Sequence, residues 1–334
     1  MKKILLVVSI LVLSLSFSGC GNNIQQEETQ TAFILNTVST ITLYNYPKDS
    51  NPQDIISRCF DLCSDYEKKL SRTIETSEIS RINSAHGEEV EVSDDTAELI
   101  NLGVKFGDIS NGKFDISIDP VSTLWDFQTA NPVVPSDEEI KEKLSHVNYK
   151  NIQVNGNKVK LLDSEAAIDL GGIAKGFIGD KAKEFLEEQG VTKAYISLGG
   201  NVLVICPEND SLKIGIQKPF GKDGELDGAV ATNKNSIVTS GIYERYFEYN
   251  GKFYHHILDT STGYPVENNL NAVTIIGPSS AWCDALSTAV FCLGEDDGLK
   301  LINSLDGYEG ILITKDNKSV LSDGIGKNVE YRAK

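Results

Sequence analysis

A glycine-rich stretch at residues 169–180, DLGGIAKGFIGD, constrains the fold of this chain more than any other segment. It follows residues 166–168, which we expect to form a short buried strand. It leads into a helix predicted over residues 181–189 and closed by Gly190. Glycine at such a turn lets the backbone approach another group closely. Because the first N–H groups of a helix are unpaired, the turn favours an anion such as a phosphate.

The glycine spacing does not match the common nucleotide-binding motifs. Gly171 and Gly176 fit the first half of a P-loop, but Phe177 and Ile178 occupy the positions of its Lys and its Ser or Thr. The stretch contains no GxGxxG either. The sequence therefore does not support a nucleoside triphosphatase or a Rossmann fold. A plain glycine-rich turn with close helix packing remains an alternative to a ligand site.

The N-terminus is typical of an exported lipoprotein. Lys2 and Lys3 precede an apolar run over residues 4–17, which is a signal-peptide pattern and is short for a membrane span. The run ends in FSGC, which resembles a bacterial lipobox and implies cleavage before Cys20 and attachment of a lipid such as palmitate to its sulfur.

We therefore expect a signal peptide over residues 1–19, a flexible tether over 20–31 and one folded domain over 32–334. This domain would be held at the extracytoplasmic face of the cell membrane. An ordinary secretory signal with an incidental Cys20 is the alternative.

The net charge and the cysteine content limit which binding partners and which disulfides this chain can have. With a net charge of −17, the chain lacks the basic surface that nucleic acid requires, so no nucleic acid partner is expected. Of six cysteines, five remain if Cys20 is lipidated, and an odd number cannot all pair internally. These five are Cys59, Cys63, Cys206, Cys283 and Cys292. No further Cys or His completes a zinc set, so we expect buried thiols rather than a disulfide scaffold.

Helices and strands are mixed along the whole chain. Apolar residues recur at helical spacing in residues 54–70, 94–110 and 279–293. Strands are predicted at 33–44 and at 194–205, the latter interrupted at Gly199 and Gly200, and a hairpin over 245–257 turns at Asn250 and Gly251. Residues 71–84 are expected to form an irregular polar connection. The pattern predicts an α+β fold with mostly antiparallel strands.

The helix predicted over residues 279–293 has a polar face opposite its apolar one. Asp284, Ser287 and Thr288 lie on that polar face. Because Asp284 and Thr288 are four residues apart, they can direct oxygens at one point. Mg²⁺ takes such hard ligands and keeps positions for phosphate oxygens. A solvated polar face is the alternative.

Two further polar clusters could take part in chemistry. His255 and His256 are adjacent in a predicted strand, so their side chains should point to opposite faces. A neutral imidazole is a suitable base near pH 7, although a hydrogen-bonded structural histidine is the alternative. Arg245, in TSGIYER at residues 239–245, could hold a phosphate or pair with an acidic neighbour.

Taken together, these motifs resemble the ApbE family, the FAD:protein FMN transferases, from about residue 33 to residue 294. The resemblance rests on DLGGIAKGFIGDKA from Asp169, ISLGGNV from Ile196, SGIYERYF from Ser240, HILDTSTGYP from His256, DALSTAVFCLG from Asp284, and the aromatic segment FDISIDPVSTLWDF from Phe114. It implies a T-fold-like catalytic domain. Four positions depart from the family pattern, namely Asn36, Thr73, Thr260 and Ser287.

The resemblance also implies roles for individual residues. Mg²⁺ would be bound by the carbonyl of Gly172 and by Asp284 and Thr288, with Ser287 nearby. Asp284 and His256 would be the catalytic residues, with His256 as the candidate base. FAD would be contacted by Lys113, Phe114, Asp115, Asp169, Lys175, Ser240, Gly241, Arg245, His256 and Leu258.

The implied reaction is Mg²⁺-dependent transfer of FMN from FAD to a Thr or Ser hydroxyl of an acceptor protein, with release of AMP. His256, or an aspartate close to it, would accept the hydroxyl proton. The acceptors implied are exported flavoprotein subunits such as those of Rnf- and Nqr-type redox pumps. Two alternatives stay open: an FAD pyrophosphatase that uses water as acceptor, and a non-catalytic lipoprotein that only binds flavin.

Overall fold

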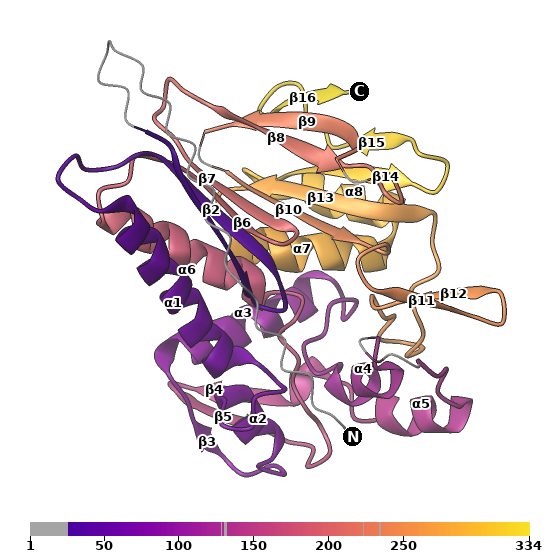
Figure 1. Ribbon diagram of the computed structural model, residues 1–334. Coiled ribbons are helices and arrows are strands. Elements are labelled where there is room, and N and C mark those ends of the chain that lie inside the picture. The colour runs from indigo at the N-terminus through magenta and orange to yellow at the C-terminus, as the bar shows by residue number, and fades with distance from the viewer. Residues whose placement is uncertain (1–25, 128, 130–131, 223, 234) are drawn as a thin grey trace, which may run out of the picture.

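A computed structural model of the protein describes residues 26–127, 129, 132–222, 224–233 and 235–334, and an eight-stranded antiparallel sheet lies at its centre (Figure 1). The strand order is β1-β2-β6-β7-β10-β13-β14-β15. Their bounds are β1 Glu28–Ile34, β2 Thr37–Asn45, β6 Lys193–Leu198, β7 Asn201–Ile205, β10 Ser236–Gly241, β13 Leu270–Gly277, β14 Glu309–Thr314 and β15 Ser319–Leu321. The α+β prediction with mostly antiparallel strands is confirmed.

Helices cover one face of this sheet, with α1, α6 and α7 packed beside one another (Figure 1). The helices of this layer are α1 Pro52–Leu70, α3 Asp94–Ile109, α6 Ala174–Glu188, α7 Ser280–Leu293 and α8 Glu295–Asn303. The hydroxyl of Ser279 accepts the N–H of Trp282 and so caps α7, which ends at Gly294 with φ 83°. Because α7 packs against β10, β13, α6 and α8, nearly all of its residues are buried.

The opposite face of the sheet is covered by a smaller antiparallel sheet of β8 (Leu212–Gln217), β9 (Leu226–Thr232) and β16 (Glu330–Ala333). Alternate residues of the central strands supply two separate cores. Ile275 packs in the core under the helices and Ile276 in the core under the small sheet, because successive side chains of a strand point to opposite faces.

The remaining elements flank the layers. These are the hairpin β11 (Tyr246–Tyr249) and β12 (Lys252–His255), the sheet of β3 (Val90–Glu91), β4 (Ile152–Asn155) and β5 (Lys158–Leu161), and the short helices α2 (Glu78–Asn83), α4 (Asp119–Trp125), α5 (Asp137–Leu144) and η1 (Tyr149–Asn151). The predicted hairpin turn is confirmed, since Asn250 and Gly251 both have positive φ.

Several predicted boundaries were wrong. The strand expected over residues 33–44 is a hairpin of β1 and β2, because Leu35 and Asn36 form a tight turn with φ 54° and 55°. Since β1 begins at Glu28, the last four residues of the predicted tether belong to the sheet. The segment 194–205 is likewise the hairpin β6–β7 rather than one interrupted strand.

The irregular connection predicted over residues 71–84 contains α2, which Ser77 caps by accepting the N–H of Ser80. The helix after the glycine stretch begins at Ala174, not at residue 181, so part of the stretch is helical. The strand predicted over residues 166–168 is a single bridge between Ala167 and Ile118.

The cysteine prediction is confirmed within the described residues, where all five thiols are buried and free. Over the same part of the chain, we find no helix that combines the length and apolar character needed to span a membrane. The predicted signal peptide and Cys20 lie outside the described residues.

Candidate active site

The candidate site is built where α6 crosses α7. A Cβ added to Gly176, in the first turn of α6, would lie 2.2 Å from the carbonyl oxygen of Ser280 and 2.8 Å from the Cα of Ala281. Only glycine therefore allows the two helices to approach this closely. The backbone N–H of Gly176 donates to Oδ2 of Asp284 at 2.8 Å, so the glycine turn and α7 share one hydrogen bond.

A second carboxylate makes the reciprocal contact. Asp180, one turn along α6 from Gly176, accepts the N–H groups of Ser280 and Ala281 at 2.7 and 3.0 Å and the hydroxyl of Ser279 at 2.9 Å. Each helix thus has N-terminal N–H groups capped by an aspartate of the other. Burial raises the pKa of Asp180, while these three bonds oppose the shift. The sequence analysis did not identify Asp180.

The residues expected to bind a metal lie together at this crossing. Asp284 is 3% exposed, and its Oδ1 lies 4.0 Å from the ammonium of Lys175. A Cβ on Gly172 would lie 3.6 Å from the hydroxyl of Thr288 and 3.1 Å from the ring of Phe114. The turn is therefore seated against both side chains. The structure brings Gly172, Asp284 and Thr288 into one place from segments more than 100 residues apart.

A hydroxyl cluster extends the site toward β10. The hydroxyl of Ser240 lies 2.7 Å from that of Ser287 and 3.2 Å from that of Thr288, and Ser287 also donates to the carbonyl of Asp284 at 2.8 Å. The hydroxyl of Ser287 is thus already engaged by two protein groups. Glycine is required at position 241, next to Ser240, because an added Cβ would lie 2.4 Å from the ring of Tyr243.

This donor set fits Mg²⁺. The described residues contain no group of three or more His, Cys, Asp and Glu side chains that could hold a metal ion. One buried carboxylate, a neighbouring hydroxyl and a backbone carbonyl are hard oxygen donors. Mg²⁺ characteristically combines one or two carboxylates with waters and substrate phosphates.

The two adjacent histidines form hydrogen bonds with different residues, which agrees with the expectation that their side chains point to opposite faces. His256 follows the end of β12, and its Nδ1 donates to the carbonyl of Arg245 at 3.2 Å, so its Nε2 carries a lone pair. The ring of His256 is partly exposed but closely surrounded by protein. This environment and the charge of Arg245 lower its pKa to about 3, so the imidazole is neutral at pH 7.

His255 is 5% exposed and serves the fold. Its Nε2 donates to the carbonyl of Val266 at 3.1 Å, and its Nδ1 accepts the N–H of Ile257 at 3.3 Å. Burial lowers the pKa of His255 to about 4.

Several residues expected to contact FAD are already engaged with other protein groups. Lys113 pairs with Asp259 at 3.1 Å. Asp115 accepts from the N–H and the hydroxyl of Ser117 and from the N–H of Tyr149, which holds the turn after α3. Leu258 packs in a separate apolar cluster that includes Trp125.

Asp169 belongs to an ion-pair cluster that the sequence analysis missed. It accepts the N–H of Gly171 at 2.8 Å and pairs with Arg72 Nε at 3.2 Å. Arg72 Nη1 also lies 3.1 Å from Asp119, whose pKa is raised to about 6 by burial although Arg72 opposes the shift. No local pattern reveals this pairing, because Arg72 lies in the connection predicted to be irregular.

Glu244 is a further missed residue, although it falls inside the recognised SGIYERYF segment. Glu244 is exposed, yet protein atoms around its carboxylate raise its pKa, while Lys175 and Arg245 lower it and Asp284 raises it. These couplings place Glu244 close to the charges at the helix crossing. A Cβ on Gly200 would lie 3.2 Å from its Oε1.

Fold and site together define an α+β protein whose glycine turn faces a helix bearing one buried carboxylate. The sequence profile of the ApbE family matches residues 35–312, and this chain belongs to the ApbE family.

Known proteins of the family resemble it over most of its length. An FAD:protein FMN transferase of Klebsiella pneumoniae (strain 342) is 34% identical over 276 residues, covering 82% of this chain and 86% of the relative. One of Treponema pallidum (strain Nichols) is 27% identical over 338 residues, covering 95% and 93%. The crystal structure of the ApbE protein of Thermotoga maritima superimposes with a TM-score of 0.82 at 32% identity, covering 89% and 97%.

Proposed function

We propose that this protein transfers FMN from FAD to a Thr or Ser hydroxyl of an acceptor protein and releases AMP. The observation that carries the proposal is the hydrogen bond between Gly176 and Asp284, which joins the glycine turn to α7 at 2.8 Å. It supports a site in which the glycine turn would bind an anion beside hard oxygen donors for Mg²⁺, which is what a pyrophosphate requires. Relatives that span most of the chain are named FAD:protein FMN transferases.

Charges around the crossing suit the pyrophosphate of FAD. Mg²⁺ would be held by Asp284, by Thr288 and by the carbonyl of Gly172, with Ser287 nearby, and when bound it neutralises charge on the pyrophosphate and the leaving AMP. The ammonium of Lys175 lies 4.0 Å from Asp284, close enough to reach the same phosphate oxygens. Arg245 would supply a second cation to the pyrophosphate. Its charge lowers the pKa of His256, which indicates that the guanidinium lies near the proposed base.

His256 is the proposed base. Because Nδ1 is bonded to the carbonyl of Arg245, Nε2 is free to accept the proton of the acceptor hydroxyl. The hydroxyl oxygen then forms a bond to the FMN-side phosphorus, and the bond from this phosphorus to the AMP oxygen breaks. An anionic substrate nearby raises the pKa of His256 above its value without ligand, which makes it a better base.

An incubation with FAD, Mg²⁺ and the soluble part of an Nqr-type flavoprotein subunit tests the proposal. We expect one AMP released per FMN attached, with flavin fluorescence that stays with the acceptor in a denaturing gel. AMP release without covalent flavin would identify an FAD pyrophosphatase. FAD binding without AMP release would identify a flavin-binding protein.

We further propose that Cys20 carries the lipid and holds the protein at the extracytoplasmic face of the membrane, where exported Rnf- or Nqr-type subunits would meet it. The FSGC motif after an apolar run supports this location. Cys20→Ser should move the protein out of the membrane fraction while FAD binding is kept. A variant that stays in the membrane fraction would refute lipid attachment at Cys20.

A further inference from the structure

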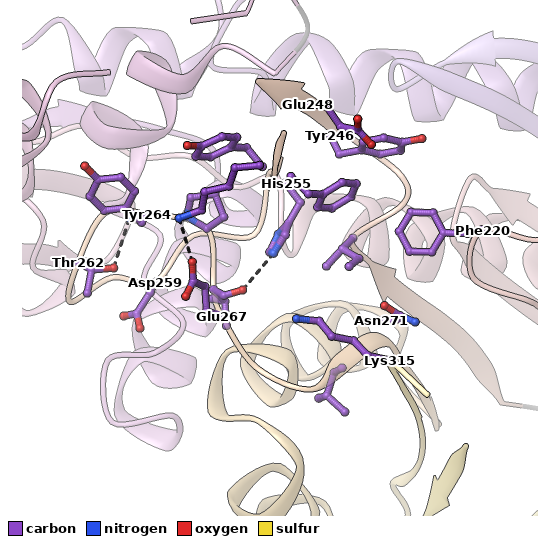
Figure 2. A pocket seen from close by; sticks show the side chains of 17 residues that line it. Phe220, Tyr246, Glu248, His255, Asp259, Thr262, Tyr264, Glu267, Asn271 and Lys315 are labelled. Carbon is purple, nitrogen blue, oxygen red and sulfur yellow. Dashed lines mark hydrogen bonds and ion pairs between the residues drawn. The ribbon is translucent and has the colours of Figure 1, made fainter. Parts of the chain in front are cut away.

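A cavity of about 770 Å³ lies beside the candidate site, on the side of β12 that bears His255 (Figure 2). Its walls come from the β11–β12 hairpin, from residues 259–267, from the start of β13 and from Lys315 after β14. None of the proposed metal ligands lines it. Since His255 and Asp259 bracket His256 in the chain, the cavity wall lies within about 10 Å of the proposed base at roughly 3.3 Å per residue.

An exposed aromatic cluster forms one wall of the cavity. The ring of Phe220 lies 6.0 Å from that of Tyr246 and 5.8 Å from that of Phe253. Phe220 is 53% exposed and Tyr246 is 45% exposed. Aromatic side chains half-exposed at the edge of a cavity are characteristic of protein interfaces, where they bury large areas with little loss of side-chain entropy.

The backbone at Phe220 is strained. Its φ is 55°, a left-handed conformation that bulky residues rarely adopt. Gly or Asn would form the same turn with less strain. The turn presents the ring of Phe220 to the cavity.

Among the described residues, one lysine of the cavity wall, Lys315, has no ion-pair partner. Figure 2 shows the Lys315 side chain directed toward the His255 side of the cavity. In the part of the chain that the structure describes, no carboxylate is within ion-pair distance of Lys315. The other lysine of the wall, Lys252, pairs with Glu267 at 3.1 Å. Within the described residues, the cavity thus offers an aromatic surface and a lysine without an ion-pair partner, in a protein whose net charge is −17; Glu248 also lines the wall.

We propose that this cavity binds an extended segment of the acceptor protein, with an acidic side chain against Lys315 and an apolar side chain against Phe220 and Tyr246. The proposal rests on the proposed function, because a protein substrate must dock close enough to deliver its hydroxyl to His256. None of the residues expected to contact FAD lines this cavity, so the acceptor segment and FAD would occupy different sites. Docking in the cavity fixes the acceptor hydroxyl relative to the base.

The test compares two cavity variants of the full chain with two matched controls. Phe220→Asn keeps the turn and removes the ring, and Lys315→Glu reverses the charge. Phe33→Ala removes an aromatic residue that is 72% exposed on β1, and Lys327→Glu reverses an exposed charge elsewhere. The probe is the soluble part of an Nqr-type flavoprotein subunit, and the measurements are kcat and KM for this acceptor, FAD binding by titration, and Tm.

We expect both cavity variants to raise the KM for the acceptor about tenfold, with kcat and FAD affinity close to wild type. The Tm of Phe220→Asn should not fall, because the substitution relieves backbone strain. Raising the salt concentration should weaken wild-type transfer more than transfer by Lys315→Glu, since only the wild type has an ion pair to screen. The two controls should match the wild type.

Cavity variants whose KM matches that of the controls would overturn the docking site while leaving the transferase function intact. An equal loss of FAD affinity would overturn it too, because the cavity would then belong to the FAD site. A change in oligomeric state that accounts for the loss would assign the cavity to a second copy of this chain. If the wild type attaches no flavin to the acceptor, the proposed function fails, and the docking proposal fails with it.

Discussion

Replacing Gly176 by alanine tests whether contact between α6 and α7 builds the site. The added Cβ would lie 2.2 Å from the carbonyl oxygen of Ser280, whereas real Cβ contacts are essentially never shorter than 3.0 Å. The neighbour is helix backbone and cannot rotate away, so the helices must separate by about 0.8 Å, the difference between these distances. That movement also stretches the hydrogen bond from Gly176 to Asp284.

The change in the free energy of unfolding of Gly176→Ala is the sum of opposing contributions. Overpacking costs about 1–3 kcal/mol, and a weakened hydrogen bond to a charged group costs about 1.5–3 kcal/mol. Alanine gains about 1 kcal/mol of helix propensity over glycine. The free energy of unfolding should therefore fall by about 3 kcal/mol, which lowers the Tm by about 5 °C in a protein of this size.

Gly179→Ala is the matched control, because it lies in the same helix. Its Cβ would meet Cδ1 of Leu203 at 2.7 Å, and this flexible side-chain end can move, so the net change should be within about 1 kcal/mol. The assay is thermal unfolding, together with FAD titration with and without Mg²⁺. We expect only Gly176→Ala to lose the Mg²⁺ enhancement of FAD binding, because only this variant displaces Asp284. A Tm for Gly176→Ala equal to that of Gly179→Ala would refute the reasoning.

Three further predictions concern the site and its surroundings. Asp284→Ala should abolish both the Mg²⁺ enhancement of FAD binding and AMP release, because Asp284 is the only charged ligand assigned to the metal. Thr288→Ala should weaken both less. An Asp284→Ala variant that keeps the Mg²⁺ enhancement of FAD binding would remove this residue from the site. His256→Gln should slow transfer by about 10²–10⁴-fold with FAD binding kept, and a near-normal rate would leave His256 a structural role. His255 is neutral and buried with a pKa of about 4, so the unfolded chain binds its proton more readily. As the pH falls from 6.5 to 4, protonation of His255 in the unfolded chain should lower the free energy of unfolding by about 3 kcal/mol. In His255→Gln, the unfolding free energy measured by denaturation at each pH should lack this dependence.

Local signals made parts of this fold predictable. The Asn250-Gly251 turn has the residues that a tight hairpin with two positive φ angles favours, and the structure contains that hairpin. Ser136 and Glu139, three residues apart, form a capping box at the start of α5. Gly294 ends α7 as predicted. In each case the residues that decide the conformation are adjacent or within one turn.

Other parts were not predictable, because the deciding residues are either atypical or distant. Leu35 and Asn36 adopt positive φ without a glycine to mark the turn between β1 and β2. Arg72 joins Asp119 and Asp169, which are separated from it by 47 and 97 positions. Helical periodicity placed Asp284 on a polar, solvated or ligand-binding face, but in the structure it is 3% exposed and bonded to the backbone of α6.

The glycine stretch at residues 169–180 shows why a helix could be mistaken for a turn when only the sequence was considered. Each glycine inside a helix costs about 1 kcal/mol relative to alanine, so Gly176 and Gly179 made α6 resemble a turn. Their small size instead admits Ser280 and Leu203 from elsewhere in the fold. Close packing at this turn is therefore compatible with the proposed ligand site. The approach that only glycine permits places the backbone N–H of Gly176 at 2.8 Å from Asp284, and the same contact sets Gly172 against Thr288.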